Sequence, residues 1–206
     1  MMISNATGCS SIYGASFPAS PYCTNAEGHG PAWANSLFED FCEFGLGMKL
    51  GSDRVRETIA EIMTQGLDCD KASDEIKALF KQWLENKNNP AITREVADKL
   101  SPLMEATDCP HCKKLLSYKK FIPARSQWII GGDGASYDIG YGGLDHVLAS
   151  GENGNILVLD TEVYSNTGGQ ASKSTPTGAV AQFAAAGKEV KKKDLAQIAM
   201  SYGYVY

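Results

Sequence analysis

The sequence predicts an α/β protein built on a parallel β-sheet, with a helical insertion in the middle of the chain. Short apolar strands alternate with helical patterns over residues 126–206, which is typical of a parallel sheet with right-handed crossovers. Residues 36–121 instead keep helical spacing of apolar side chains over many turns. The chain therefore divides into a loop-rich start, a helical middle and a strand–helix–strand end.

Residues 1–35 are rich in glycine, serine, proline and asparagine. The first residues, MMIS, are expected to end a strand. The stretch NATGCSSIYGASFPASPYCTNAEGHGPAW is expected to form one long ordered loop. Loops of this length inside a compact domain are usually functional, so we expect this segment to contribute to a site.

Residues 36–121 are expected to be helical. Ser36 and Glu39 have the spacing of a capping box that opens a helix over SLFEDFCEFGLGM, with Phe38 on its apolar face. Pro102 is expected to break the last helix of this zone. The apolar positions at helical spacing are Phe41, Leu46, Val55, Ile59, Ile62, Met63, Ile76, Leu79, Phe80, Trp83, Leu84, Val96, Leu100, Leu103 and Met104. These stripes indicate core packing rather than chemistry.

Residues 126–206 alternate between strands and helices. SQWII is predicted as a strand that ends in GGDG, and NILVLD as a second strand buried on both faces. The helix between them is expected to end at Gly151. Asp194 is expected to cap a further helix, LAQIAMSY, which ends at Gly203 before YVY begins another strand.

Polar clusters follow both predicted strands, GDG after the first and DTEVYSN after the second. Ligands of such sheets bind outside the carboxyl ends of the strands. Gly132 and Gly134 allow close approach of the backbone, and the helix that follows can bind phosphate. Asp133 and Thr161 add hard oxygen atoms of the kind that Mg²⁺ takes together with phosphates. The pattern favours a metal-bridged diphosphate over a glycine turn with a capping Asp, and no GxGxxG marks a dinucleotide site.

Composition and charge exclude several classes of function. The chain is 43% hydrophobic and 21% charged, which is ordinary for a globular protein. Its net charge of -5 argues against nucleic acid as a partner, and the run Lys191–Lys193 is interpreted as a solvated helix entry. Because the sequence has no bilayer-length apolar run and no signal-peptide pattern, we expect a cytoplasmic protein without membrane contact.

The six cysteines do not form a compact disulfide framework, so reduced thiols or metal ligands are expected. Cys109 and Cys112 have the CxxC form of a redox or zinc pair. A zinc site needs two further ligands, of which Cys69 could supply one. Without a second CxxC, the segment CPHC is interpreted as an incidental surface pair, with a labile metal or redox site as the alternative.

GDG followed by a polar cluster on the next strand resembles the thiamine diphosphate motif. The flanking segments YDIGYGGLDHVLASG and LVLDTEVYSNTGGQASKSTPTGAVAQFAAAGK resemble the pyruvate:ferredoxin (flavodoxin) oxidoreductase family, as do NATGCSSIYG and GPAWANSLFEDFCEFGLGM. The resemblance covers nearly the whole chain, weakly over residues 52–120. It implies a partial thiamine diphosphate-binding domain over residues 1–206, with a helical insertion at 36–121 and a βαβ core at 126–206.

The resemblance also implies roles for single residues. Asp133 and Thr161 would bind Mg²⁺ through their side chains, and Val163 through its carbonyl oxygen. Asn166 would be catalytic, and Cys9 would be one of four ligands of a [4Fe–4S] cluster. The residues implied to line the cofactor are Gly132, Asp133, Gly134, Ala135, Thr161, Glu162, Val163, Tyr164, Ser165 and Asn166.

Members of this family decarboxylate a 2-oxo acid, here pyruvate, on thiamine diphosphate. They pass electrons through iron–sulfur clusters to ferredoxin or flavodoxin and transfer the acyl group to coenzyme A. The resemblance further implies other domains and a homodimer. This chain has Ala135 where the family has Trp, and lacks matches to the other cluster cysteines and to the glutamate that activates the cofactor. We therefore expect a fragment that is inactive alone; the alternatives are a non-catalytic binding fragment and a thiol or zinc module on CPHC.

Overall fold

The computed structural model describes residues 1–10 and 24–206, so the middle of the predicted N-terminal loop, with Cys23, lies outside the described residues. The contacts divide the chain into two compact units. The first unit comprises Met1–Lys49 and Ser126–Tyr206, and the second comprises Leu50–Arg125. Helix α2, Phe41–Gly66, contributes its first residues to the first unit and the rest to the second.

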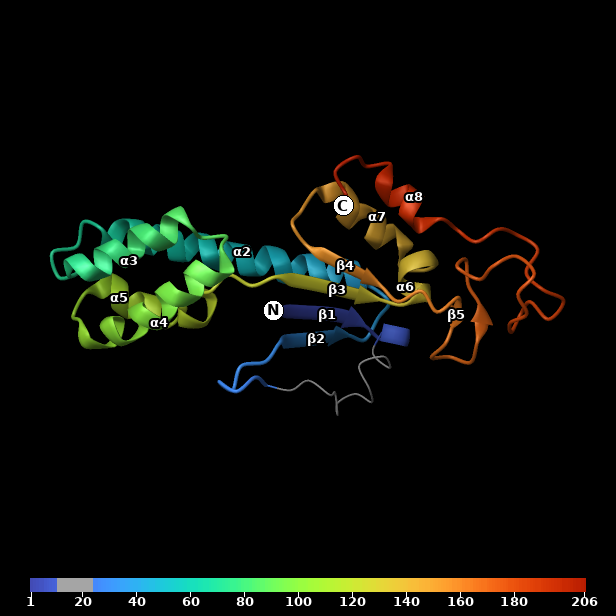
Figure 1. Ribbon diagram of the computed structural model, residues 1–206, viewed down its shortest axis with the longest axis horizontal. Helices are drawn as coiled ribbons and strands as arrows, with labels where there is room; N and C mark the ends of the chain where they lie inside the picture. Colours follow the sequence, from blue (N-terminus) through green and yellow to red (C-terminus); the bar gives the residue numbers. More distant parts are fainter. Residues whose placement is uncertain (11–23) are drawn as a thin grey trace. The chain divides into compact units, whose positions relative to one another are not determined.

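The first unit contains a four-stranded parallel sheet in the order β2-β1-β3-β4. Its arrowheads in Figure 1 all point toward α6 and β5, so the carboxyl ends of the strands share one edge. The strands are Met2–Ala6 (β1), Ala32–Ser36 (β2), Gln127–Gly131 (β3) and Asn155–Val158 (β4). This sheet with its helices confirms the predicted α/β class.

Helices and a hairpin complete the first unit. They are α6 (Asp133–Tyr137), α7 (Tyr141–Ser150), β5 (Val163–Tyr164), β6 (Gln170–Ala171) and α8 (Leu195–Met200). Gly151 ends α7 in the left-handed conformation, with φ 66°, as predicted. Asp194 caps α8 by accepting a hydrogen bond from the N–H of Gln197 at 2.9 Å, again as predicted. The core of this unit joins β1, β3, α2, α6 and α7 through Ala6, Phe41, Cys42, Ile129, Ala135, Leu144 and Val147.

NILVLD contains a strand as predicted, but its expected burial on both faces was wrong, as was the strand expected at YVY. β4 is an edge strand of the described sheet, and its residues alternate between exposed and half-buried, with Leu157 38% exposed. An apolar run alone cannot distinguish an edge strand from a central one. Residues 204–206 form no strand in the described chain, and the Tyr204 hydroxyl instead donates to the carbonyls of Leu148 at 3.0 Å and Ala149 at 3.2 Å.

The predicted capping box was also wrong, because Ser36 belongs to a strand that the sequence analysis missed. Ser36 pairs with Ala6 in the sheet, so its backbone cannot open a helix. Its hydroxyl lies 2.5 Å from the carboxylate of Asp40, and α2 begins only at Phe41. Phe38, expected on the apolar face, is 74% exposed, and the Glu39 carboxylate lies beside Gly134.

The second unit consists of helices only. Beside the later part of α2 it contains α3 (Asp74–Glu85), α4 (Pro90–Ala106), α5 (Pro110–Leu116) and the 3₁₀ turn η1 (Lys119–Phe121), shown in Figure 1. Their apolar faces enclose a core with Phe80, Trp83, Leu100 and Met104 fully buried, as the helical spacing predicted. None of the helices in residues 1–10 and 24–206 has the length and apolar character needed to cross a bilayer.

Pro102 does not break α4, contrary to the prediction. A proline inside a helix loses one backbone hydrogen bond and costs about 3 kcal/mol. In α4, Leu100 and Met104 lie on either side of Pro102 and are completely buried. Burial of two large apolar side chains contributes about 1.5–3 kcal/mol each, which is enough to offset the proline.

Candidate functional site

The candidate site is organised around the carboxylate of Asp133, which is completely buried at the start of α6, directly after β3. Its Oδ1 accepts a hydrogen bond from the backbone N–H of Thr161 at 2.9 Å. Its Oδ2 accepts hydrogen bonds from the hydroxyls of Ser172 at 2.9 Å and Ser174 at 2.5 Å. One buried carboxylate therefore connects the end of β3 with the segments that follow β4 and β6.

A second oxygen cluster lies next to Asp133, around the Thr161 hydroxyl. This hydroxyl is 3.4 Å from Asp133 Oδ1, 3.4 Å from Ser165 Oγ, and donates to the carbonyl of Val163 at 3.0 Å. Glu162 between them has a left-handed backbone, with φ 65°, which is unfavourable for a non-glycine residue and common at functional sites. The strained residue turns the Val163 carbonyl back toward Thr161.

These oxygen atoms lie within about 0.5 Å of the spacing that Mg²⁺ requires. Octahedral Mg²⁺ with ligands at about 2.0–2.1 Å places adjacent ligand oxygens about 2.9 Å apart. The Thr161 hydroxyl lies 3.0 Å from the Val163 carbonyl and 3.4 Å from Asp133 Oδ1. A carboxylate, a hydroxyl and a carbonyl are also the hard ligands that this ion prefers. The three residues therefore fit a magnesium ion.

The glycines of GDG lie where no side chain fits. A Cβ on Gly132 would lie 2.6 Å from the Cβ of Cys9, and one on Gly134 would lie 2.6 Å from Cε1 of Tyr164. Cys9 therefore packs directly against the GDG turn, although it is distant in sequence. Both glycines are buried, and their missing side chains allow Cys9 and Tyr164 to pack closely against the turn.

Glu39 is a site residue that the sequence analysis missed. Its Oε2 would lie 2.8 Å from a Cβ on Gly134, and within the described chain this oxygen is buried without a hydrogen-bond partner. Burial raises the pKa of the Glu39 carboxyl, and the negative charge of Asp138 raises it further. The pKa of Tyr164 is raised too, by burial and by its hydrogen bond to Asp138. Because the sequence analysis did not predict strand β2, it assigned Glu39 to a helix cap and gave it no role in the site.

Asn166 lies at the margin of a small hollow beside the GDG turn. The hollow has a volume of about 20 Å³ and is lined by Cys9, Glu39, Gly132, Gly134, Tyr164 and Asn166, among others. A larger cavity of about 610 Å³ lies at the opposite ends of the strands, against Trp128 and Asn155. The larger cavity is not near the residues that the motifs selected, so volume alone does not identify the site.

The buried hydroxyls around Asp133 belong to a segment to which sequence analysis gave no role. Ser172, Ser174 and Thr175 are at most 5% exposed. The ammonium of Lys188 donates to the carbonyls of Ser172 at 2.9 Å and Thr175 at 2.6 Å and so holds the segment in place. The available signal was the run ASKSTPTG, in which small hydroxyl residues gather without any large apolar residue.

The interpretation of the lysine run as a solvated helix entry was wrong for Lys192 and Lys193. The Lys192 ammonium lies 2.6 Å from Asp160 Oδ2 and 3.3 Å from Glu162 Oε1. Burial alone would raise the pKa of Asp160, but hydrogen bonds from Lys192 and Tyr137 outweigh it and lower the pKa. Lys193 lies 3.0 Å from the centre of the Tyr141 ring. Lys192 therefore holds the two residues that flank Thr161, and Lys193 contacts Tyr141 and the Tyr137 carbonyl.

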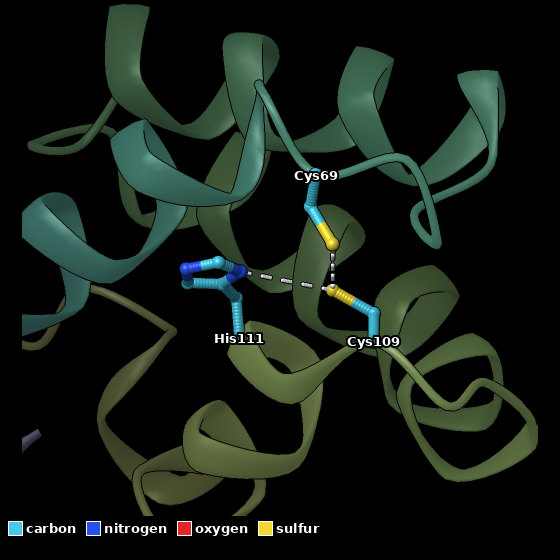
Figure 2. A group of neighbouring side chains, drawn as sticks. All are labelled: Cys69, Cys109 and His111. Carbon is cyan, nitrogen blue, oxygen red and sulfur yellow. Dashed lines mark hydrogen bonds between the residues drawn. The ribbon is translucent and has the colours of Figure 1, made fainter.

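The second unit contains a separate group of sulfur and nitrogen atoms, shown in Figure 2. Cys109 Sγ lies 3.3 Å from Cys69 Sγ and 4.0 Å from His111 Nδ1. Cys109 and Cys112 are completely buried, so the interpretation of CPHC as a surface pair was wrong. Burial alone would raise the pKa of Cys109, but hydrogen bonds from the Cys112 backbone and from the thiols of Cys69 and Cys112 lower it.

Known proteins with similar sequences show what this chain is related to. Residues 115–206 match the family described as "Thiamine pyrophosphate enzyme, C-terminal TPP binding domain". Over its whole length the chain is 60% identical to the pyruvate-flavodoxin oxidoreductase of Klebsiella pneumoniae and 54% identical to the pyruvate:ferredoxin oxidoreductase of Moorella thermoacetica. The chain is therefore assigned as a homologue of one region of pyruvate-flavodoxin and pyruvate:ferredoxin oxidoreductases.

This assignment confirms the resemblance found from the motifs. The chain spans about 18% of the length of these two oxidoreductases. It is also 49% identical, over 207 residues, to the mitochondrial pyruvate dehydrogenase [NADP(+)] of Euglena gracilis and spans 12% of that protein. The match to a thiamine pyrophosphate-binding domain includes both GDG and the Thr161–Asn166 run.

Proposed function

We propose that this chain forms the region of a pyruvate:ferredoxin or pyruvate:flavodoxin oxidoreductase that binds thiamine diphosphate and Mg²⁺. The supporting observation is the convergence of Asp133, Thr161 and Val163 at the carboxyl edge of the sheet, with oxygen spacings suited to Mg²⁺. The domain bounds predicted from sequence, with an insertion at 36–121 and a core at 126–206, are part of this proposal.

Each residue of the site has a separate task. Asp133, Thr161 and the Val163 carbonyl would hold the metal, and the metal would neutralise the diphosphate. Gly132 and Gly134 would admit the phosphates beside the backbone. When bound, thiamine diphosphate supplies the carbanion stabilisation that decarboxylation of a 2-oxo acid needs. Ser172 and Ser174 would keep the Asp133 carboxylate oriented through its Oδ2.

Asn166 is proposed as the catalytic residue of this chain, with Glu162, Tyr164, Ser165 and Ala135 lining the cofactor. Its place at the margin of the hollow beside Cys9 and Gly134 supports this role. In an intact oxidoreductase that carries this segment, Asn166→Ala should lower turnover far more than cofactor affinity, because an interaction made in the transition state acts on kcat. Unchanged turnover with lost binding would restrict Asn166 to positioning the cofactor.

The cofactor needs more space than the described residues enclose. The hollow beside GDG measures about 20 Å³. Small-molecule sites usually have about 300–1,000 Å³. Movement of the Thr161–Thr167 segment or a second protein surface would have to supply the difference, and a homodimer or further domains of the enzyme are proposed as that surface.

A [4Fe–4S] cluster needs four thiolates, and the described residues supply one at this site, Cys9. Cys42 is buried in the core beside Phe41, and burial raises the pKa of its thiol. We therefore propose that Cys9 contributes one ligand in an assembly and that the chain alone binds the cofactor without oxidising pyruvate. Electron transfer to ferredoxin or flavodoxin, acyl transfer to coenzyme A and a cytoplasmic location are proposed for the whole enzyme.

Calorimetry of the full chain with thiamine diphosphate and Mg²⁺ tests the proposal. Asp133→Asn keeps the side-chain volume but removes the anionic ligand, so Mg²⁺-dependent affinity should fall by at least roughly 100-fold. Asp145→Asn is the matched control, because this carboxylate accepts a hydrogen bond from Tyr202 at 2.6 Å and does not contact the Asp133 cluster. Equal affinity of wild type and Asp133→Asn, in the full chain or in an intact oxidoreductase that carries this segment, would refute the proposal.

A further inference from the structure

Three potential metal ligands meet in the second unit, and a fourth, Cys112, follows them in α5. Cys69 lies in the turn after α2, and Cys109, His111 and Cys112 lie at the start of α5. The ligand atoms of Cys69, Cys109 and His111 all lie within 4.8 Å of one another. Cys112 is completely buried, and the neighbouring thiols of Cys109 and Cys69 add to the burial that raises its pKa.

Two distances in this group lie within about 0.5 Å of the edges of a tetrahedral zinc site. With Zn–S at about 2.3 Å and Zn–N at about 2.0–2.1 Å, the edges of the tetrahedron are about 3.8 Å between two sulfurs and about 3.5 Å between sulfur and nitrogen. The corresponding distances here are 3.3 Å from Cys109 to Cys69 and 4.0 Å from Cys109 to His111. In Figure 2 the Cys69 sulfur and the His111 ring both point toward the Cys109 sulfur.

We infer that Cys69, Cys109, His111 and Cys112 bind one structural Zn²⁺ ion. Three thiolates and one imidazole are a ligand set of closed, tetrahedral zinc sites. The site is separate from the oxygen cluster of the first unit, whose hard ligands select Mg²⁺. It does not depend on the proposed function, since none of the four residues belongs to the cofactor region.

The two segments that carry the ligands are held together by other contacts. The Thr107 hydroxyl donates to the carbonyl of Lys71 at 3.1 Å and accepts a hydrogen bond from the backbone N–H of Cys109 at 3.2 Å. Thr107 therefore connects the turn that carries Cys69 to the residue that opens α5. This contact arranges the sulfur atoms of Cys69 and Cys109 in advance, which lowers the entropic cost of binding a metal.

The surroundings indicate a structural rather than a catalytic ion. Cys109 and Cys112 belong to the apolar core of the second unit together with Phe80 and Leu115. A closed four-ligand site leaves no position for substrate, and its binding energy contributes directly to folding. The ion would fasten α5 to the turn between α2 and α3 in a unit that has no sheet among its described residues.

A disulfide is the competing outcome, and the geometry favours the metal. Cys69, Cys109 and Cys112 are free thiols, and the 3.3 Å between the Cys69 and Cys109 sulfurs exceeds the roughly 2.05 Å of a disulfide bond. A disulfide would use two of the four side chains and give no role to the His111 nitrogen beside Cys109. Zinc uses all four.

The test is metal analysis of the full chain, purified reduced and without chelators, and loaded with either Zn²⁺ or Co²⁺. We expect one equivalent of zinc and, with Co²⁺, the visible bands of a tetrahedral thiolate site. Cys69→Ser removes a half-buried ligand and should cut the sulfur-to-cobalt absorbance by about one third and weaken zinc binding at least roughly tenfold. Cys42→Ala and His146→Ala are the matched controls and should keep full binding.

Removing the metal gives a second readout that does not depend on a variant. A strong chelator should lower the Tm of the full chain, and added Zn²⁺ should restore it. Three results would overturn the inference: no zinc or cobalt uptake by the folded reduced chain, full uptake by Cys69→Ser, or a native disulfide between Cys69 and Cys109 found by mass mapping.

Discussion

The two units of this chain place their reactive side chains in opposite kinds of environment. In the first unit, polar groups from three segments meet at the carboxyl edge of a sheet, around the buried Asp133. In the second unit, sulfur and nitrogen atoms meet inside the core of a helical bundle, around Cys109. The difference follows from solvation. A buried carboxylate is costly unless hydrogen-bond donors surround it, whereas a thiol packs in a core as a small apolar group.

This contrast predicts how each unit tolerates change. The oxygen site depends on backbone groups, because Thr161 contributes its N–H and Val163 its carbonyl. The sulfur site depends on side chains of two short segments. Changes that move the backbone should therefore harm the first unit most, and changes of ligand type should harm the second.

The largest loss of stability is expected from the substitution Gly140→Ala. It tests whether the first unit depends on close backbone contacts. A Cβ on Gly140 would lie 2.3 Å from the carbonyl oxygen of Ala135 and 2.5 Å from that of Glu39. Because neither backbone atom can rotate away, Gly140→Ala should lower the free energy of unfolding by roughly 1–3 kcal/mol or more and weaken cofactor binding.

The same change at two other glycines provides the controls. Gly142, in the first turn of the helix that follows Gly140, has open space at its Cβ position, so Gly142→Ala should stabilise by about 0.5–1 kcal/mol. In the second unit, a Cβ on Gly66 would lie 2.6 Å from the Phe80 ring, which is a side chain and can shift. Chemical denaturation measures all three, and a Gly66→Ala cost equal to that of Gly140→Ala would contradict the contrast between the units.

A smaller change in stability, which depends on pH, is expected when the Glu39 carboxyl is replaced. Its folded-state pKa is raised by burial and then by Asp138, so the folded state binds a proton more readily than the unfolded chain does. Stability is then greatest below the unfolded-state pKa and decreases as pH rises through the raised folded-state pKa. Glu39→Gln removes this loss, so the variant should gain stability over wild type as pH rises from about 4 to about 7.

Urea denaturation across this pH range checks the prediction, with Glu189→Gln as the control because Glu189 is an exposed glutamate of the same unit. A difference between Glu39→Gln and wild type that does not change with pH would show that Glu39 is not titrating as a buried group. Its role beside Gly134 would then be limited to packing.

How well the sequence predicted each region depends on how local its physical signal is. Helix spacing, the Asp194 cap and the Gly151 stop are set within a few residues, and the structure confirms them. β2 was missed because AWANS has no apolar alternation and is a strand only through its pairing with β1. β4 was predicted as a strand, but its position at the sheet edge is not encoded in its own residues.

The sites show the same limit. GDG and DTEVYSN follow their strands in the sequence, so their meeting at Asp133 could be predicted from topology. Ser172, Ser174 and Glu39 come from a loop and from a missed strand end, and only the three-dimensional contacts reveal them. Cys69 and Cys109 are 40 residues apart, so their contact likewise depended on the packing of the helices.

The smallest change in stability is expected from substitution of Lys192. It tests whether charged residues other than Asp133 support the oxygen site. Its ammonium pairs with Asp160 at 2.6 Å and Glu162 at 3.3 Å, but all three side chains are partly exposed. Such pairs contribute about 0.2–1 kcal/mol, and salt screens them. Lys192→Gln should therefore lower the free energy of unfolding slightly at low salt, with the difference disappearing at about 1 M salt.

Binding should respond to Lys192→Gln in the opposite direction from stability. Loss of a positive charge beside Asp160 and Glu162 leaves the residues that flank Thr161 more negative, so Mg²⁺ should bind slightly more tightly at low salt. Lys191→Gln changes the net charge equally at an exposed neighbouring position and is the control. If both variants change Mg²⁺ affinity and stability by the same amounts, the ion pairs of Lys192 do not support the site and only the overall charge matters.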